Sequence, residues 1–140
     1  MPLVDLDTIP QVPLPFINDD HLEEARLLNE LAEAVDALRR GGGSAAAVAG
    51  RFADLDVHTR EHFAREEDAM RRADFPPYPV HKGEHDRVLA EMSAEGRRFQ
   101  DRADAARLWT YVSETVPAWF VGHIQSMDLI TARFLAMRDG

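Results

Sequence analysis

The stretch SAAAVAGRFADLDVHTREHFAREEDAMRRADFPP, residues 44–77, decides the fold class. Ser44 is a suitable N-cap, and the sequence Phe75-Pro76-Pro77 cannot continue a helix. Between them, apolar residues recur at steps of three and four, the period of an amphipathic helix. The inward face would carry Val48, Phe52, Leu55, Thr59, His62, Glu66 and Met70. We therefore expect one long helix with a histidine and a glutamate on its buried face.

The same reasoning predicts three further helices. The first begins near Asp20 and stops at Gly41–Gly43, the third begins near Tyr78–Val80 and ends around Gln100–Asp104, and the last spans about Ala103–Met137 with a kink or displaced turn at Pro117. Their expected inward faces are His21, Ala25, Leu28, Ala32, Val35 and Leu38; then Val80, His81, His85, Val88, Met92 and Phe99; then Trp109, Val112, Val116, Trp119, Phe120, His123, Met127, Ile130 and Phe134. Four amphipathic helices with short connections predict an all-α, antiparallel up-down-up-down four-helix bundle.

The amino-terminal segment differs in composition from the rest of the chain. Residues 1–17 contain Pro2, Pro10, Pro13 and Pro15, a density that opposes helix formation. We expect residues 1–17 to form an extended arm and residues 18–140 to form the bundle.

Charge and composition exclude several classes of function. The formal net charge of −9 and the absence of a long apolar run disfavour nucleic acid and membrane as partners. With no cysteine, the chain can form neither a disulfide, an iron–sulfur cluster nor a zinc–thiolate site. The amino terminus lacks the pattern of a secretory signal, so we expect a cytoplasmic protein.

Ionisable residues on the inward faces are the informative feature of this sequence, because a buried charge is costly unless it is paired or binds a metal. His62 and Glu66 are four residues apart, as are His81 and His85, so each pair lies on one helix face. His21 and His123 also fall on inward faces, whereas His58 lies about 80° from that of its helix. We therefore exclude His58 as a ligand and expect it at the edge, hydrogen-bonded to a neighbour.

Periodicity leaves Asp128 undecided, because five residues from His123 correspond to about 140° on an ideal helix. A bulge, or distortion from Pro117, would turn it inward, while the alternative is a solvated aspartate. Imidazole with carboxylate suits iron, copper, nickel or zinc. Five inward histidines exceed the needs of one ion, and two ions bridged by Glu66 and Asp128 would use the whole set.

Four stretches resemble the hemerythrin family in its bacterial single-domain form. They are INDDH (17–21), HFAREEDAM (62–70), YPVHKGEH (78–85) and WFVGHIQSMD (119–128). The resemblance implies two iron ions, one held by His81, His85 and His123 and the other by His21 and His62. Glu66 and Asp128 would bridge them, together with an oxo or hydroxo group. It also implies that dioxygen binds at the open position of the second iron.

The resemblance aligns Phe63, Trp119, Phe120 and Ile124 with the apolar lining of the family's oxygen pocket, although ordinary core packing would also explain them. A reversible dioxygen carrier, store or delivery protein, not an enzyme, is the leading hypothesis. A di-iron enzyme or sensor acting on peroxide, nitric oxide or oxygen is the alternative, followed by iron storage and by a purely structural bundle. No histidine here has glutamate three positions before it, which argues against a ferritin-like oxidase.

Overall fold

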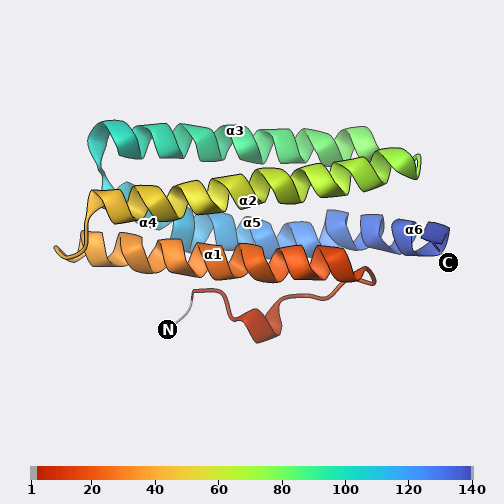
Figure 1. Cartoon of the computed structure of the whole chain (residues 1–140), viewed down its shortest axis with the longest axis horizontal. Helices are drawn as coiled ribbons and strands as arrows, with labels where there is room; N and C mark the ends of the chain where they lie inside the picture. The colour runs from red at the N-terminus through yellow and green to blue at the C-terminus, as the bar shows by residue number, and fades with distance from the viewer. Residues whose placement is uncertain (1–2, 140) are drawn as a thin grey trace.

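Four long helical segments lie side by side, each antiparallel to the next along the chain (Figure 1). The structure is a computed structural model and describes residues 3–139; Pro2 of the predicted arm and Gly140 of the predicted bundle lie outside the described residues. The segments are α1 (Pro15–Arg39), α2 (Ala45–Arg72), α3 (Tyr78–Arg102) and a fourth made of α4 (Ala105–Thr110), α5 (Val116–His123) and α6 (Leu129–Asp139). The predicted up-down-up-down bundle is confirmed, and residues 3–139 contain no strand.

Glycines and capping side chains determine where the helices end and begin. Gly41 and Gly43 both adopt positive φ, at 90° and 62°, which glycine does without strain. Ser44 caps α2 as expected, its Oγ accepting a hydrogen bond from the Ala47 amide at 3.0 Å. Asp104 caps α4 in the same way, accepting from the Arg107 amide at 3.0 Å. These short turns bring consecutive helices into antiparallel contact.

The core runs the length of the bundle between the four segments. It is built from the predicted apolar faces, with Leu28, Val35, Val48, Leu55 and Val112 almost completely buried. None of the helices within residues 3–139 combines the length and apolar character needed to cross a bilayer.

The first helix begins earlier than its sequence suggested. We expected it near Asp20, but α1 begins at Pro15, so the last three residues of the predicted arm belong to the helix. Proline is tolerated at the first helical position because the amide there has no helical partner to lose. The side chain of Asn18, within this helix, binds the arm.

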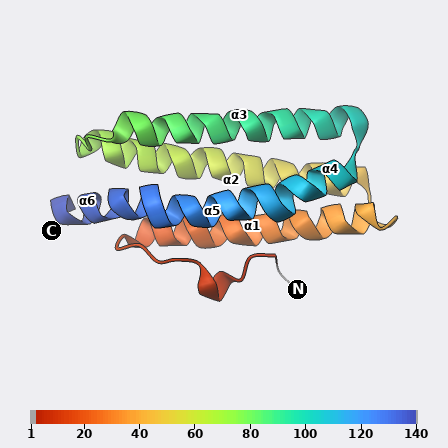
Figure 2. The same ribbon diagram turned by 180° about the vertical axis from the view of Figure 1, so that it is seen from behind.

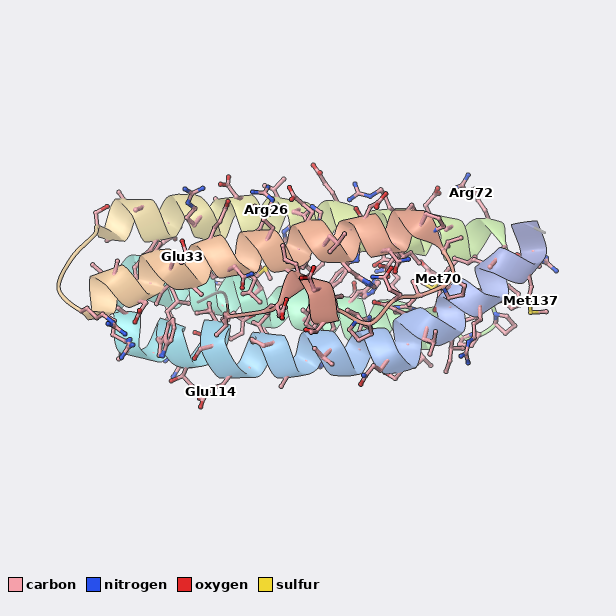
Figure 3. All side chains as sticks on the ribbon, turned by 90° about the horizontal axis from the view of Figure 1, so that it is seen from below. Arg26, Glu33, Met70, Arg72, Glu114 and Met137 are labelled. Atoms are coloured by element: carbon pink, nitrogen blue, oxygen red, sulfur yellow. The ribbon has the colours of Figure 1, made fainter. Side chains whose placement is uncertain are left out.

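Two asparagine side chains hold the arm antiparallel along α1, on the side of α1 away from α3 (Figures 1 and 2). Asn29 accepts from the Val4 amide at 2.7 Å and donates to the Val4 carbonyl at 2.8 Å. Asn18 makes the same pair of bonds with Val12, at 2.9 and 2.8 Å. Between these points lies a short 3₁₀ turn, η1 (Leu6–Thr8), and Ile9 is buried against the core. In Figure 3, viewed from below, the arm covers this side of the bundle.

Two π-helical turns interrupt the fourth segment, η2 (Tyr111–Thr115) and η3 (Ile124–Asp128). The first ends two residues before Pro117, which has no amide to donate and would clash with the carbonyl four residues earlier. The expected displaced turn is therefore confirmed. Each π turn adds a residue to the helical repeat and so rotates everything after it.

This rotation corrects part of the predicted inward face. Ile130 was expected in the core but is 58% exposed, because η3 shifts the buried positions to Thr131, Ala132 and Leu135. Val80 was also wrongly placed inside and is 65% exposed. It precedes the buried His81, and one helical residue corresponds to about 100° of rotation.

We expect Asn29→Ala to release the start of the arm, because the Val4 amide and carbonyl would lose their only side-chain partner in α1. A buried unsatisfied pair of this kind should lower the free energy of unfolding by about 1–3 kcal/mol. Limited proteolysis should then cut within residues 3–9 faster than in the parent. Glu33→Ala, exposed on the same helix, is the control, and equal cleavage of both variants would contradict the clamp.

Candidate metal centre

Seven ionisable side chains converge in the interior of the bundle. They come from all four helical segments and all are buried: His21 of α1, His62 and Glu66 of α2, His81 and His85 of α3, His123 of α5 and Asp128 of η3. These are the seven residues selected from the sequence. The structure brings all of them together, although they are spread over more than a hundred positions of the chain.

The seven residues form two adjacent groups. Within each group, the potential ligand atoms lie within 4.8 Å of one another. One group is His81, His85, His123 and Asp128, and the other is His21, His62 and Glu66. Each group could hold one cation.

The two carboxylates join these groups. Asp128 Oδ1 lies 3.1 Å from both His81 Nε2 and His123 Nε2, while its Oδ2 lies 2.8 Å from His21 Nε2. Glu66 Oε2 lies 2.6 Å from His62 Nε2. Its other oxygen, Oε1, lies 3.5 Å from His85 Nε2. Each carboxylate therefore presents one oxygen to each group.

The π turn η3 resolves the position of Asp128. On a regular helix this side chain would point away from His123, but here the Leu129 amide bonds to the Ile124 carbonyl five residues earlier. With a five-residue repeat, His123 and Asp128 lie on the same side of the helix. Asp128 is 2% exposed, so the solvated alternative is wrong.

Electrostatics keep both carboxylates ionised. Burial and the Asp128 charge both raise the pKa of Glu66. The charge and hydrogen bond of His62 outweigh them and lower this pKa to about 2. Burial also raises the pKa of Asp128, yet hydrogen bonds from His123, His21 and His81 hold it well below its usual range. Burial lowers the pKa of His62, but the charge and hydrogen bond of Glu66, together with the nearby Glu24 carboxylate, raise it well above its ordinary value.

The residues present fit a pair of cations. Glu66 Oε1 and His85 Nε2 are buried, face each other and have no hydrogen-bond partner among residues 3–139. Such groups are rare in folded proteins and need a compensating partner. Two negative charges and converging imidazoles are the donors that iron, zinc, copper or nickel would use.

Outer hydrogen bonds fix two of the imidazole rings. His81 Nδ1 lies 2.8 Å from Thr131 Oγ1, and His85 Nδ1 lies 2.9 Å from Glu67 Oε2. Because the outer nitrogen of each ring is engaged, the Nε2 atom is directed into the centre.

The four residues expected to form an apolar lining surround the imidazoles. Phe63 stacks on His85 with ring centroids 3.8 Å apart, and Trp119 stacks on His123 at 4.5 Å. Phe120 meets His21 edge-on at 5.7 Å, and Ile124 is fully buried. Phe120 and Trp119 also line a cavity of about 90 Å³ next to the centre. The centre is thus enclosed by apolar side chains.

Comparison with known proteins identifies the family. The family described as Hemerythrin HHE cation binding domain matches residues 12–135. The chain belongs to the hemerythrin family. Membership implies a non-haem iron site, in agreement with the donor set of the centre.

Two bacteriohemerythrins are similar in sequence to this chain. The one from Ralstonia nicotianae (strain ATCC BAA-1114 / GMI1000) is 43% identical over 82 residues, which is 59% of this chain and 58% of that relative. The one from Aquifex aeolicus (strain VF5) is 28% identical over 120 residues, 86% of this chain and 88% of its own. The aligned region thus spans less than two thirds of the Ralstonia relative.

Solved structures share the fold. A crystal structure of a hemerythrin variant superposes with a TM-score of 0.82 at 22% identity and covers 96% of this chain and 98% of its own. A second hemerythrin variant gives a TM-score of 0.77 over 89% of each chain.

Four residues near the centre were not selected from the sequence as site residues: Glu24, Thr59, Glu67 and Thr131. Thr59 was expected on the inward face but given no role. Glu24 follows His21 by three residues, a spacing that places both on one helix face and could have drawn attention to it. His58 lies at the edge of the centre, its Nε2 3.1 Å from the Asp20 carbonyl.

We expect a transition-metal ion to stabilise the protein, because it would satisfy the unpartnered donors and offset the buried negative charge. Adding two equivalents of Zn²⁺ to the metal-free protein should raise Tm by several degrees in differential scanning calorimetry, since a ligand that binds only the folded state adds its binding free energy to stability. Mg²⁺, which prefers oxygen donors, is the control. Equal shifts with both ions would count against an imidazole site.

Proposed function

We propose that this protein holds two iron ions and binds dioxygen reversibly, as a carrier, store or delivery protein and not as an enzyme. His81, His85 and His123 would hold the first iron, and His21 and His62 the second. Glu66 and Asp128, with an oxo or hydroxo group, would bridge them. Two adjacent ferrous ions can supply the electrons needed to bind dioxygen and recover them when it leaves.

The observation that carries this proposal is the arrangement of the two carboxylates. Asp128 directs Oδ1 toward His81 and His123 and Oδ2 toward His21, while Glu66 divides its oxygens between His85 and His62. A single metal would engage only one oxygen of each carboxylate. Two metals use both oxygens, as expected for bridging ligands in di-iron bundles.

The unequal number of histidines supports binding of an external ligand. Three imidazoles approach one group and two approach the other, so the second ion would keep a position free of protein ligands. That position would lie near His21 and His62, the side where Phe120 packs edge-on against His21.

The apolar side chains would favour a carrier over an enzyme. Phe63, Phe120 and Ile124 are each less than 5% exposed, and they keep water from the imidazoles. Limiting the access of water and proton donors slows irreversible oxidation of the metal and the release of bound oxygen as peroxide.

We expect about two irons per chain and a visible absorption band that appears on admitting air to the reduced protein and disappears on removing it. Metal analysis and anaerobic spectroscopy on one sample test this. Iron that oxidises at once without a reversible band, or rapid turnover of hydrogen peroxide or nitric oxide, would favour the enzyme or sensor instead.

Glu66→Ala should reduce the iron content from about two to about one per chain, because one bridging ligand is lost from both sites. Glu61→Ala, exposed on the same helix, should keep both irons. Metal analysis with circular dichroism separates loss of iron from loss of fold. Unchanged iron content and an unchanged spectrum in Glu66→Ala would contradict the assignment of Glu66 as a bridging ligand.

A further inference from the structure

The carboxylate of Glu24 is buried beside the centre without a permanent cation. Glu24 is 7% exposed, and no lysine or arginine within residues 3–139 forms an ion pair with it. Its ionisable neighbours are the imidazoles of His58, at 3.5 Å, and His62, at 3.7 Å. A buried carboxylate costs several kcal/mol unless it is compensated, so this placement requires an explanation.

Thr59 fixes the direction of this carboxylate. Its hydroxyl lies 2.6 Å from Glu24 Oε2 and 2.8 Å from the Leu55 carbonyl, and the threonine is 1% exposed. With Oε2 engaged, Oε1 is left facing His58 Nε2 at 3.5 Å and His62 Nδ1 at 3.7 Å. His58 Nε2 is already hydrogen-bonded to the Asp20 carbonyl, whereas Glu24 Oε1 and His62 Nδ1 are buried and have no hydrogen-bond partner among the described residues.

Metal binding would determine where the His62 proton lies. His62 Nε2 points at Glu66 and is the nitrogen that the centre would use. With a metal on Nε2, a neutral imidazole carries its proton on Nδ1, and a ligating histidine normally donates that proton to a carboxylate, carbonyl or water. Glu24 Oε1 is the acceptor at hand, and closing 3.7 Å to hydrogen-bond length takes less than 1 Å.

We propose that Glu24 is a positioning residue for the second metal ion: its Oε1 accepts the Nδ1 proton of His62 and holds that ring with Nε2 directed into the centre. The inference rests on the proposed di-iron site. Glu24 would do for His62 what Thr131 does for His81 and Glu67 does for His85.

The effect should be concentrated on one ion. The second group has only two imidazoles, and His21 Nδ1 has no partner among the described residues, so His62 would be the only ring of this pair held from outside. In the metal-free protein the neighbours of Glu24 are imidazoles, one of which, His62, also faces Glu66, whereas a bound ion would add a permanent positive charge. The residue therefore should strengthen metal binding while adding a buried negative charge to the metal-free protein.

Two variants and a control test this with Co²⁺ as the probe. Glu24→Gln removes the charge, Glu24→Leu removes the acceptor, and Glu114→Gln removes an equal charge from an exposed position of the fourth segment. We expect the second equivalent of Co²⁺ to bind about 10- to 100-fold more weakly in both Glu24 variants, with the first equivalent unchanged. Glu114→Gln should bind as the parent does.

The metal-free protein supplies a readout that a purely structural role would not give. If Glu24 serves the metal, Glu24→Leu should have an unchanged or higher Tm without metal and a smaller rise in Tm with it. In the Zn²⁺-loaded parent, ¹⁵N NMR should show the His62 proton on Nδ1. This proton should exchange slowly with solvent in the parent and faster in Glu24→Leu.

Three outcomes would overturn the inference. Unchanged affinity for the second Co²⁺ would show that Glu24 does not position His62, and a lower Tm without metal together with unchanged affinity would make it structural. Glu24, His58 and His62 also lie close enough together to hold an ion. If the parent binds a third Co²⁺ and His58→Phe does not, His62 Nδ1 itself binds a cation. A parent that takes up no Co²⁺ would instead overturn the proposed function, and this inference with it.

Discussion

Glu66 and Asp128 are the constraint on which the structure depends, since both carboxylates are held ionised where water does not reach. Their charges are offset by imidazoles drawn from every helical segment, with contacts such as His21 to Asp128 at 2.8 Å and His62 to Glu66 at 2.6 Å. Rotating or sliding one helix would separate a charge from its partners, which costs several kcal/mol in a buried site. The polar centre therefore fixes the relative register of helices whose apolar faces alone would tolerate several.

The fourth segment shows what this constraint requires of a helix. A regular helix through residues 105–139 would direct Asp128 away from His123, and Pro117 would already disturb its hydrogen bonds. Two π turns accommodate both demands, one ending two residues before the proline and one between the histidine and the aspartate. Such turns are uncommon and occur often at functional sites, because they redirect one side chain without breaking the helix.

The centre is arranged in layers. Imidazoles and carboxylates face inward, aromatic rings of Phe63 and Trp119 stack on their outer faces, and polar groups engage the outer nitrogens at 2.8 Å for His81 and 2.9 Å for His85. The rings are thus held in orientation by packing and by hydrogen bonds that do not involve a metal. A preorganised site of this kind loses little conformational entropy when an ion binds.

The sequence by itself determined the four helices, their turns and the set of histidines, because helical periodicity, N-caps such as Ser44 and breakers such as Gly41 act within a few residues. It placed six of the seven centre residues on inward faces. It could not place Asp128, the start of α1 or the exposed Ile130 from periodicity. Those depend on a π turn and on Asn18 binding the arm instead of capping a helix. Only the tertiary structure decided that each carboxylate faces both histidine groups and that Glu24 of α1 faces His62 of α2. Such contacts depend on how neighbouring helices are rotated against one another, which no local pattern specifies.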